Sequence, residues 1–159
     1  DDVCKHFLNK LDKSYSVDNI TLIQPTSPFV RPDVISRSLQ MLTDNKLLDS
    51  VTTVAKTDHR HHPYNLGLPA DSITWEHLFA QERQESRTRQ SKPDIFKLCN
   101  LITVRSKVIL NSNRYGQTMG YIVCEELLSW DIDYKWQLEA AEMLIKSKHV
   151  NLNHMESNQ

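Results

Sequence analysis

The sequence predicts an α/β fold with a mainly parallel sheet, and three observations lead to that prediction. Residues 20–24 and 50–55 are short runs of mainly apolar and β-branched residues, which is typical of buried strands. The segment between them includes Pro32, followed by apolar residues at helical spacing. A strand, a helix and a second strand in this order imply a right-handed crossover that joins two parallel strands.

The predicted helices follow from apolar periodicity and from the positions of proline. Residues 3–11 predict a first helix, whose apolar stripe would consist of Val3, Phe7, Leu8 and Leu11. Pro25 ends the first strand, and Pro32 suits the first position of the second helix. The buried face of this second helix would consist of Ile35, Leu39 and Leu42.

The second half of the chain continues the alternation after a long interruption. We expect strands over residues 98–104 and 121–124, a short helix over 105–110 and a closing helix over 134–146. From 56 to 94 the periodicity fades, and an irregular stretch of that size is more often a functional excursion or an oligomer arm than filler. We therefore expect one domain over residues 1–147 and a polar tail over 148–159 that frays.

Composition argues against several classes of protein. The chain has 159 residues and three glycines, where average usage predicts about eleven, so these residues contain no glycine-rich phosphate loop. A net charge of -1 gives no reason to expect nucleic-acid or membrane binding, and no apolar run approaches the ~18 residues of a membrane span. Three cysteines without a CxxC pair favour a reducing compartment, so we expect a cytoplasmic protein, or a nuclear one in an animal.

The most informative segment is Gln-Pro-Thr-Ser-Pro at residues 24–28, directly after the first strand. Open α/β sheets bind ligands at the carboxyl ends of their strands. Gln24 would offer a donor and an acceptor there, and Thr26 and Ser27 would offer hydroxyl groups on a loop that the prolines fix. The alternative is a plain strand-to-helix connection that uses proline as a stop signal.

Two acidic residues, Asp131 and Asp133, precede the closing helix. In an extended segment their carboxylates project to one side, where they repel each other unless a cation or a basic group lies between them. Magnesium suits such a pair, because proteins hold it through one or two carboxylates, water and substrate phosphates. The alternative is an aspartate cap of the helix beside an unrelated surface aspartate.

Basic residues in the irregular stretch are weaker indications of a site. Arg89 would suit the bidentate binding of a carboxylate, although a solvated charged loop is the more common role of such a segment. Residues 59–62, His-Arg-His-His, lack the spacing of a helical zinc site, so a polar loop is the better interpretation.

Taken together, these segments resemble the acylneuraminate cytidylyltransferase family, the CMP-sialic acid synthetases and their relatives. The matches follow the family's order over nearly the whole chain: residues 24–28 (QPTSP), His62 with Pro63, Arg89 with Gln90, Asn100, residues 131–133 (DID), and Ala141 with Glu142. Each match alone is common, whereas the ordered set is specific.

The resemblance implies a Rossmann-like nucleotide-diphospho-sugar transferase fold and usually a homodimer, with residues 56–94 as a sugar-side lid and dimer arm. It implies an enzyme in which the anomeric hydroxyl of a nine-carbon acid sugar attacks the α-phosphate of CTP, so that pyrophosphate leaves and a CMP-sugar forms. It assigns Mg2+ to Asp131 and Asp133 and the sugar carboxylate to Arg89, as the catalytic set. The other substrate contacts would be Gln24, Ser27, Gln90 and Asn100.

The chain also departs from the family. Leu101 stands where the family has glycine, and Gln137 replaces the acidic residue usually found four positions after the DID motif. The family's amino-terminal strand and its CTP-gripping loop have no counterpart in these residues, so we expect them in a longer protein and the chain alone to be inactive. The alternative is a non-catalytic remnant that binds a sugar acid or serves in dimerisation. The ordered set argues against a third interpretation, an α/β interaction domain with coincidental matches.

Overall fold

The computed structural model describes residues 1–12 and 14–150 and divides the chain into two compact units. The first combines residues 1–55 with those from Leu98 onward, and the second is Lys56–Lys97. The second unit overlaps residues 56–94, the irregular stretch of the sequence. Of the predicted polar tail, residues 151–159 lie outside the described residues. No helix in the described part of the chain combines the length and hydrophobicity that crossing a membrane requires.

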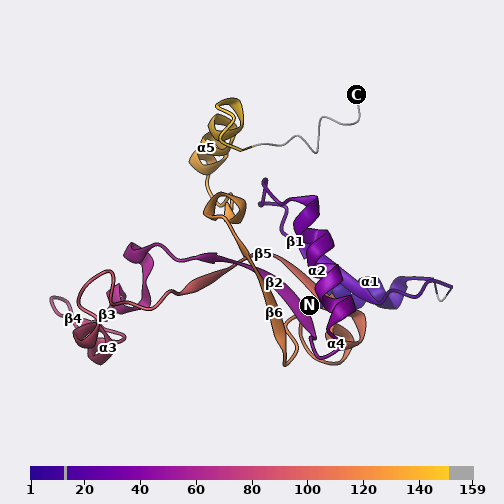
Figure 1. Cartoon of the computed structure of the whole chain (residues 1–159), viewed down its shortest axis with the longest axis horizontal. Coiled ribbons are helices and arrows are strands. Elements are labelled where there is room, and N and C mark those ends of the chain that lie inside the picture. Colours follow the sequence, from indigo (N-terminus) through magenta and orange to yellow (C-terminus); the bar gives the residue numbers. More distant parts are fainter. Residues whose placement is uncertain (13, 151–159) are drawn as a thin grey trace. The chain divides into compact units, whose positions relative to one another are not determined.

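A four-stranded sheet lies at the centre of the first unit, as far as the structure describes the chain (Figure 1). The strands lie in the order β1-β5-β2-β6. Their bounds are Asn19–Ile23 for β1, Phe96–Arg105 for β5, Ser50–Lys56 for β2 and Met119–Cys124 for β6. The sequence-based predictions of these strands are confirmed, with small differences at their ends.

The sheet is mixed, so the prediction of a mainly parallel sheet is confirmed only in part. β2 and β6 pair in parallel, whereas β1 and β5 pair antiparallel. β5 also runs against β2, since the Arg105 N–H donates to the Asp49 carbonyl at one end and the Thr57 N–H to the Ile95 carbonyl at the other. The predicted parallel pair, β1 and β2, therefore runs in one direction, but β5 lies between its members. The crossover rule determines direction and hand, and it leaves open how many strands are skipped.

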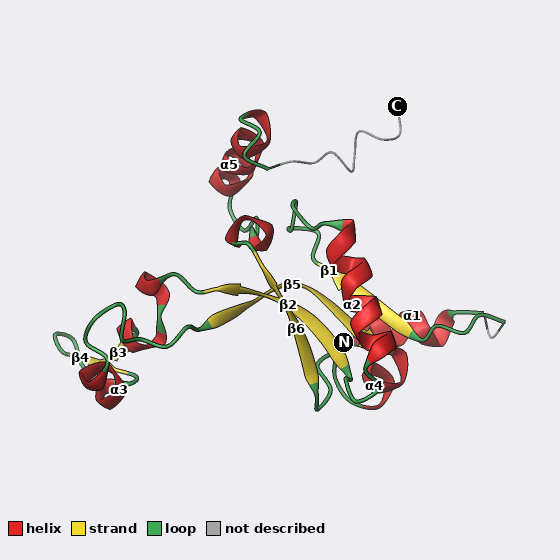
Figure 2. Ribbon diagram, in the orientation of Figure 1, coloured by secondary structure: helices red, strands yellow, loops and turns green. Residues whose placement is uncertain are grey.

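Helices cover both faces of this sheet (Figure 2). On one face lies α2, Pro32–Asp44, in a cluster formed by Val34, Leu42, Val51, Leu101 and Ile122. On the other face lie α1, Asp2–Lys10, and α4, Ser106–Asn111, in a cluster formed by Cys4, Val104 and Ile109. Residues of β5 thus supply both clusters, because the side chains of a strand project to both faces of its sheet.

The first helix forms where the sequence predicts it, but it buries a different face. Val3 and Phe7 are exposed, and α1 packs through Cys4 and Leu8. These two residues are four apart, and so they form a narrower stripe than the one predicted.

The buried face of α2 also differs from the predicted one. Leu39 is more than a third exposed, whereas Ser38 is fully buried. The Ser38 hydroxyl is satisfied inside the protein, because it shares a hydrogen bond of 2.6 Å with the Thr103 hydroxyl of β5. A pattern based on apolar residues cannot place a serine whose partner lies on a distant strand.

The second unit is more ordered than the sequence predicts. It contains two short 3-10 turns, η1 (His59–His61) and η2 (Pro63–Asn65), an antiparallel hairpin of β3 (Gly67–Pro69) with β4 (Trp75–His77), and the short helix α3 (Ala80–Glu85). The Asp71 carboxylate closes the hairpin turn by accepting the N–H groups of Ile73 and Thr74 at 2.8 and 2.7 Å. Elements this short leave little periodicity in a sequence.

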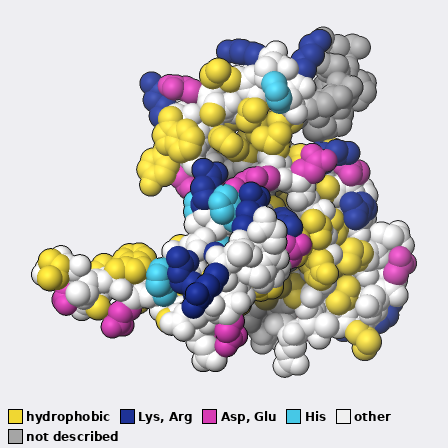
Figure 3. Space-filling model, turned by 60° about the vertical axis from the view of Figure 1, so that its left-hand side comes forward, with side chains coloured by type: hydrophobic (Ala, Val, Ile, Leu, Met, Phe, Trp, Pro, Cys, Tyr) yellow, Lys and Arg dark blue, Asp and Glu magenta, His cyan; other side chains and the backbone are white. Residues whose placement is uncertain are grey.

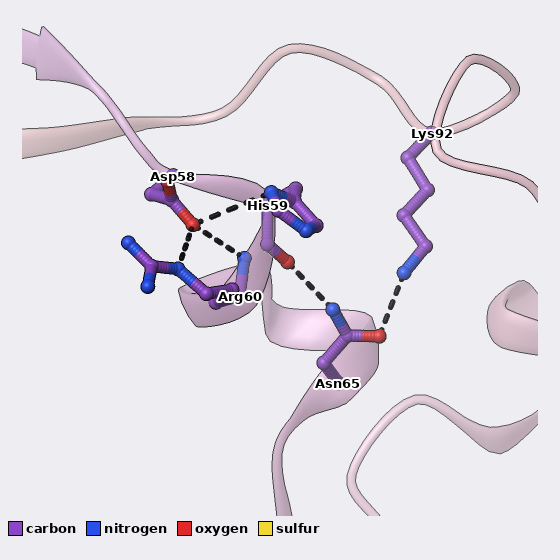
Figure 4. A network of polar contacts seen from close by, with 5 residues as sticks. All are labelled: Asp58, His59, Arg60, Asn65 and Lys92. Carbon is purple, nitrogen blue, oxygen red and sulfur yellow. Dashed lines mark hydrogen bonds and ion pairs between the residues drawn. The ribbon is translucent and has the colours of Figure 1, made fainter.

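A polar network connects residues 58–65, near the start of the second unit, with Lys92, near its end (Figure 4). The Asp58 carboxylate accepts the backbone N–H and the side-chain Nε of Arg60, and these bonds, chiefly the one from the side chain, lower the pKa of Asp58 to about 2. Asn65 donates to the His59 carbonyl at 2.6 Å and accepts from Lys92 at 2.7 Å. Asn65 therefore links the segment that contains His59 to the segment that contains Lys92.

The closing helix α5, Lys135–Lys146, follows the 3-10 segment η3, Glu126–Ser129. It packs Ala141 and Leu144 against Phe29, which is only 1% exposed. Other hydrophobic side chains reach the surface of the molecule in several places (Figure 3). On α5 the most exposed of them are Met143 and Trp136.

Candidate functional site

The loop after β1 and the segment before α5 meet, although they are far apart in the sequence. The Ile132 N–H donates to the Thr26 carbonyl at 3.0 Å. Phe29, which follows the same loop, packs in one cluster with Trp130 and Ala141. The QPTSP and DID segments therefore form a single junction beside the carboxyl end of β1. We call this place the Thr26–Ile132 junction.

Asn100 on β5 ties β1 to this junction. Its carbonyl accepts the Gln24 N–H at 3.2 Å, and its side-chain Nδ2 donates to the Trp130 carbonyl at 3.1 Å. The Trp130 indole Nε1 donates in turn to the Gln137 carbonyl at 3.3 Å. The residue directly before Asp131 is thus held from two sides. The sequence predicts Asn100 as a substrate neighbour, and the structure gives its side-chain amide a protein partner.

Two buried polar atoms at the junction have no hydrogen-bond partner among the described residues. They are Oγ of Ser27, a residue that is 8% exposed, and Oδ1 of Asp131. Leaving such an atom unpaired costs about 1–3 kcal/mol, so nearly all buried polar atoms have partners. Both residues are ones that the sequence predicts for the site. Unpaired atoms of this kind are ones whose hydrogen-bonding capacity a ligand could satisfy.

The side chain of Gln137 caps α5. This argues against the alternative in which one aspartate of the acidic pair is the helix cap. Its side-chain Oε1 accepts the backbone N–H groups of Asp133 and Tyr134 at 2.6 and 2.7 Å. These N–H groups would otherwise lack partners at a helix start. Neither Asp131 nor Asp133 acts as the helix cap, and the carboxylate of Asp133 remains exposed.

The donor chemistry of the acidic pair fits a magnesium ion. Magnesium takes oxygen ligands and keeps several from water and phosphate. Asp131 offers a buried unpaired oxygen and Asp133 an exposed carboxylate. Among the described residues, no three His, Cys, Asp or Glu side chains gather in a way that would hold a metal. An ion at this place would therefore depend on oxygens from water and substrate as well.

Arg89 and Gln90, the predicted partners of a carboxylate, belong to the second unit. Both are exposed in a turn that Ser91 closes by donating from Oγ to the Thr88 carbonyl at 2.9 Å. Neither side chain has a hydrogen bond or ion pair within the described residues, so both are available to a ligand. The structure brings together Gln24, Ser27, Asn100 and Asp131 within the first unit, and it describes Arg89 and Gln90 within the second.

His62 has a structural role that sequence reasoning missed. The sequence favours a polar loop, yet His62 is only 4% exposed. Its ring Nδ1 accepts the Tyr64 N–H at 3.2 Å, and its Nε2 lies 3.1 Å from the Pro93 carbonyl. Because Nδ1 accepts, the contact with the Pro93 carbonyl is one in which Nε2 donates. The available signal was Pro63, which fixes the start of η2 directly after the histidine.

Leu101, the replacement for the family's glycine, is accommodated in the core. It is 2% exposed and packs in the α2 cluster. With Asn100 and Cys124 it also lines a pocket of about 10 Å³, space for about one water molecule. Burial raises the pKa of the Cys124 thiol. A pocket of this size holds no nucleotide or sugar.

Comparison with known proteins identifies the fold. No family model matches the sequence, and no curated protein is detected as a relative. A CMP-2-keto-3-deoxy-manno-octonic acid synthetase complexed with CTP has a TM-score of 0.60 at 12% identity, over 91% of this chain and 68% of that one. A 4-diphosphocytidyl-2C-methyl-D-erythritol synthase from Anaerococcus prevotii has a TM-score of 0.58 at 10% identity, over 89% of this chain and 64% of that one.

The chain has the nucleotide-diphospho-sugar transferase fold that these two cytidylyltransferases share. It spans about two thirds of the length of either one. At such low identity the likeness establishes the fold alone.

Proposed function

We propose that these residues form the sugar- and magnesium-binding part of a cytidylyltransferase that transfers CMP from CTP to a nine-carbon acid sugar and releases pyrophosphate. The observation that carries the proposal is the hydrogen bond of 3.0 Å between Ile132 and Thr26. It joins the two most specific motifs beside the unpaired oxygen of Asp131. The structural neighbour complexed with CTP supports the choice of nucleotide, and the motifs support the acid sugar.

Each predicted residue has a role that its surroundings permit. The reaction forms a bond from the sugar hydroxyl to the α-phosphorus and breaks the bond to pyrophosphate, so it needs alignment and charge neutralisation. A magnesium ion held by Asp131 and Asp133 would screen the phosphate charge. Gln24 and Ser27 would bind the sugar, and Arg89 with Gln90 would bind its carboxylate side. Asn100 positions the backbone before Asp131.

The homodimer that the resemblance implies would use the second unit. Three large hydrophobic side chains of its hairpin are exposed, Leu68, Ile73 and Trp75, and Ile73 reaches 92%. Exposed groups of this kind are typical of interaction surfaces. Light scattering on the wild type and on Ile73→Ser tests this role. We expect a dimer for the wild type and a shift toward monomer for the variant, while two identical masses would contradict it.

Pyrophosphate release tests the proposed activity. The full-length protein is assayed with CTP and Mg2+ against neuraminic, legionaminic and pseudaminic acids and 3-deoxy-octulosonic acid. We expect release with a nine-carbon acid, its loss on removal of Mg2+, and its loss in Asp131→Asn. Asp44→Asn, an exposed change at the end of α2, serves as the matched control and should remain active. No release with any acid would overturn the proposal.

One observation favours a second candidate, a non-catalytic remnant that binds a sugar acid. Gln137 carries an amide where the family pattern has a carboxylate, and this amide is occupied as a helix cap. Calorimetry distinguishes the candidates, because a remnant would bind the acid sugar without binding CTP and Mg2+. Binding of CTP with Mg2+ by the full-length protein would exclude the remnant.

A further inference from the structure

A polar pocket lies at the opposite end of the sheet from the Thr26–Ile132 junction. The register of β1 and β5 pairs Ile23 with Leu101 near the junction and Asn19 with Arg105 at the far end. The pocket surrounds this far end and has a volume of about 500 Å³, within the range of about 300–1,000 Å³ that small-molecule sites occupy. It is far larger than the pocket beside Leu101, and the proposed cytidylyltransferase reaction does not use it.

Two residues that line this pocket carry buried polar atoms without partners among the described residues. They are Oγ of Ser106 and Oδ1 of Asn19. Ser106 is 7% exposed, and its backbone N–H is already occupied by the Asp18 carbonyl at 2.9 Å. The hydroxyl of Ser106 can therefore donate to a ligand, and the side-chain oxygen of Asn19 requires a donor from one.

The pocket also has an excess of positive charge. Lys46, Arg105 and Lys107 line it, against one carboxylate, that of Asp18. The Arg105 guanidinium is held rigidly, since Nε and Nη2 donate to the carbonyls of Leu42, Asn45 and Leu48. Those carbonyls are neutral, so they do not offset its charge. Neither lysine forms an ion pair within the described residues.

Asp49 is the other carboxylate near these cations, and its charge interacts with Lys107 and Arg105. Its Oδ2 accepts the backbone N–H groups of Gln117 and Thr118 at 2.8 and 3.2 Å. The pocket therefore combines two ammonium groups that form no ion pair among the described residues, a fixed guanidinium and a hydroxyl donor. Its acceptors are the Asp18 carboxylate and Oδ1 of Asn19, the buried one that still needs a donor. An anion alone would satisfy the donors and leave Asn19 unpaired.

We propose that this pocket binds a small phosphate monoester that also carries a hydroxyl group, the chemistry of a polyol or sugar phosphate. The phosphate oxygens accept from Ser106 and from the two lysines, and the hydroxyl donates to Asn19. Because the pocket and the junction lie at opposite ends of β1, occupancy here is separate from CMP transfer. A negative result in the cytidylyltransferase assay would not contradict binding at this pocket. In the same way, absence of binding at this pocket would not contradict CMP transfer.

Titration of the isotope-labelled full-length protein tests the proposal by amide chemical shifts, at constant ionic strength. The probes are glycerol 3-phosphate, inorganic phosphate and glycerol. We expect saturable shifts at Asn19, Ser106 and Lys107 with glycerol 3-phosphate, weaker binding of phosphate and none of glycerol. No saturable shift with either phosphate compound, or shifts confined to the junction, would overturn it.

Variants separate binding from folding. Ser106→Ala removes a hydroxyl that has no hydrogen-bond partner in the described part of the chain, so it should fold as the wild type does while glycerol 3-phosphate affinity falls by about tenfold. Lys107→Ala should weaken both phosphate compounds, and Asn19→Ala should reduce the preference for glycerol 3-phosphate over phosphate. Ser36→Ala and Lys10→Ala are the matched exposed controls. Equal affinity in Ser106→Ala and in its control would contradict the assignment.

Discussion

The side-chain amide of Asn100 donates to the carbonyl oxygen of Trp130 at 3.1 Å, and so β5 holds the residue directly before Asp131. The bond matters because the acidic segment has few other restraints: the Ile132 N–H bonds Thr26, and Gln137 caps the helix that follows. Three separate parts of the first unit thus determine where the carboxylate of Asp131 lies.

Replacing Asn100 should therefore affect the site more than the fold. Asn100→Ala leaves the Trp130 carbonyl unpaired, at a cost of about 1 kcal/mol of unfolding free energy. We expect activity to fall by more than this cost implies, because the acidic segment loses its anchor. Urea unfolding and steady-state kinetics of the same sample measure both effects. Asn111→Ala, which removes an exposed bond to Lys107 on α4, is the control. Equal kinetic losses in the two variants would refute the positioning role.

Asp131→Asn should reduce activity without reducing stability. The variant removes a charge beside a buried oxygen that has no hydrogen-bond partner among residues 1–12 and 14–150, so its Tm in the absence of metal should equal or exceed that of the wild type. Activity should fall by about 10²–10³-fold. CTP with Mg2+ should raise the Tm of the wild type only. A variant that is destabilised without metal would show that Asp131 has a structural partner instead.

His62→Ala should loosen the second unit without affecting the first. It removes the ring bonded to Tyr64 and Pro93, and each buried group left unpaired costs about 1–3 kcal/mol. We expect faster amide hydrogen exchange within Lys56–Lys97 and unchanged exchange in α2. His61→Ala, an exposed change next to it, should leave both regions as they are. Uniformly faster exchange throughout the chain would contradict a local role.

Asp49 gives the fold a predictable acid sensitivity. The N–H groups of Gln117 and Thr118 lower the pKa of its carboxyl in the folded protein. The unfolded chain, with a pKa of about 3.9, then takes up the proton first as the pH falls. The stabilisation is present above that value and disappears as the pH falls through the folded pKa. Urea unfolding between pH 7 and pH 3 should show the difference between wild type and Asp49→Asn shrinking with acid. A constant difference would exclude this origin.

The fold was largely predictable because local signals and global arrangement agree. Pro32 begins α2 as expected, and the runs that form β1 and β2 are apolar because they are buried. The errors have identifiable causes. The burial of Ser38 was not predicted because its hydrogen-bond partner, Thr103, is remote in sequence. The position of β5 between β1 and β2 was not predicted because the sequence of a strand does not indicate which strands pair with it.

The candidate site was predictable only in part. Gln24, Ser27 and Asp131 could be selected because polar residues directly after or before buried elements have few structural reasons to be there. Their convergence depends on the bond between Thr26 and Ile132, which involves backbone atoms and so leaves no trace in residue types. The capping role of Gln137 was not predicted for a different reason. Its side chain accepts from residues that precede it, Asp133 and Tyr134, whereas the comparison with the family pattern showed only that a carboxylate is absent at this position.

We propose above all that the Thr26–Ile132 junction holds the magnesium ion and the sugar of a CMP transfer. Paramagnetic Mn2+ in place of Mg2+, added in substoichiometric amounts with CTP to the full-length protein, tests it directly through the line widths of backbone amides. We predict that Ser27, Asp131 and Asp133 broaden first, while Ser106 at the other end of the sheet stays sharp. Broadening that begins elsewhere, with the junction unaffected, would contradict the claim.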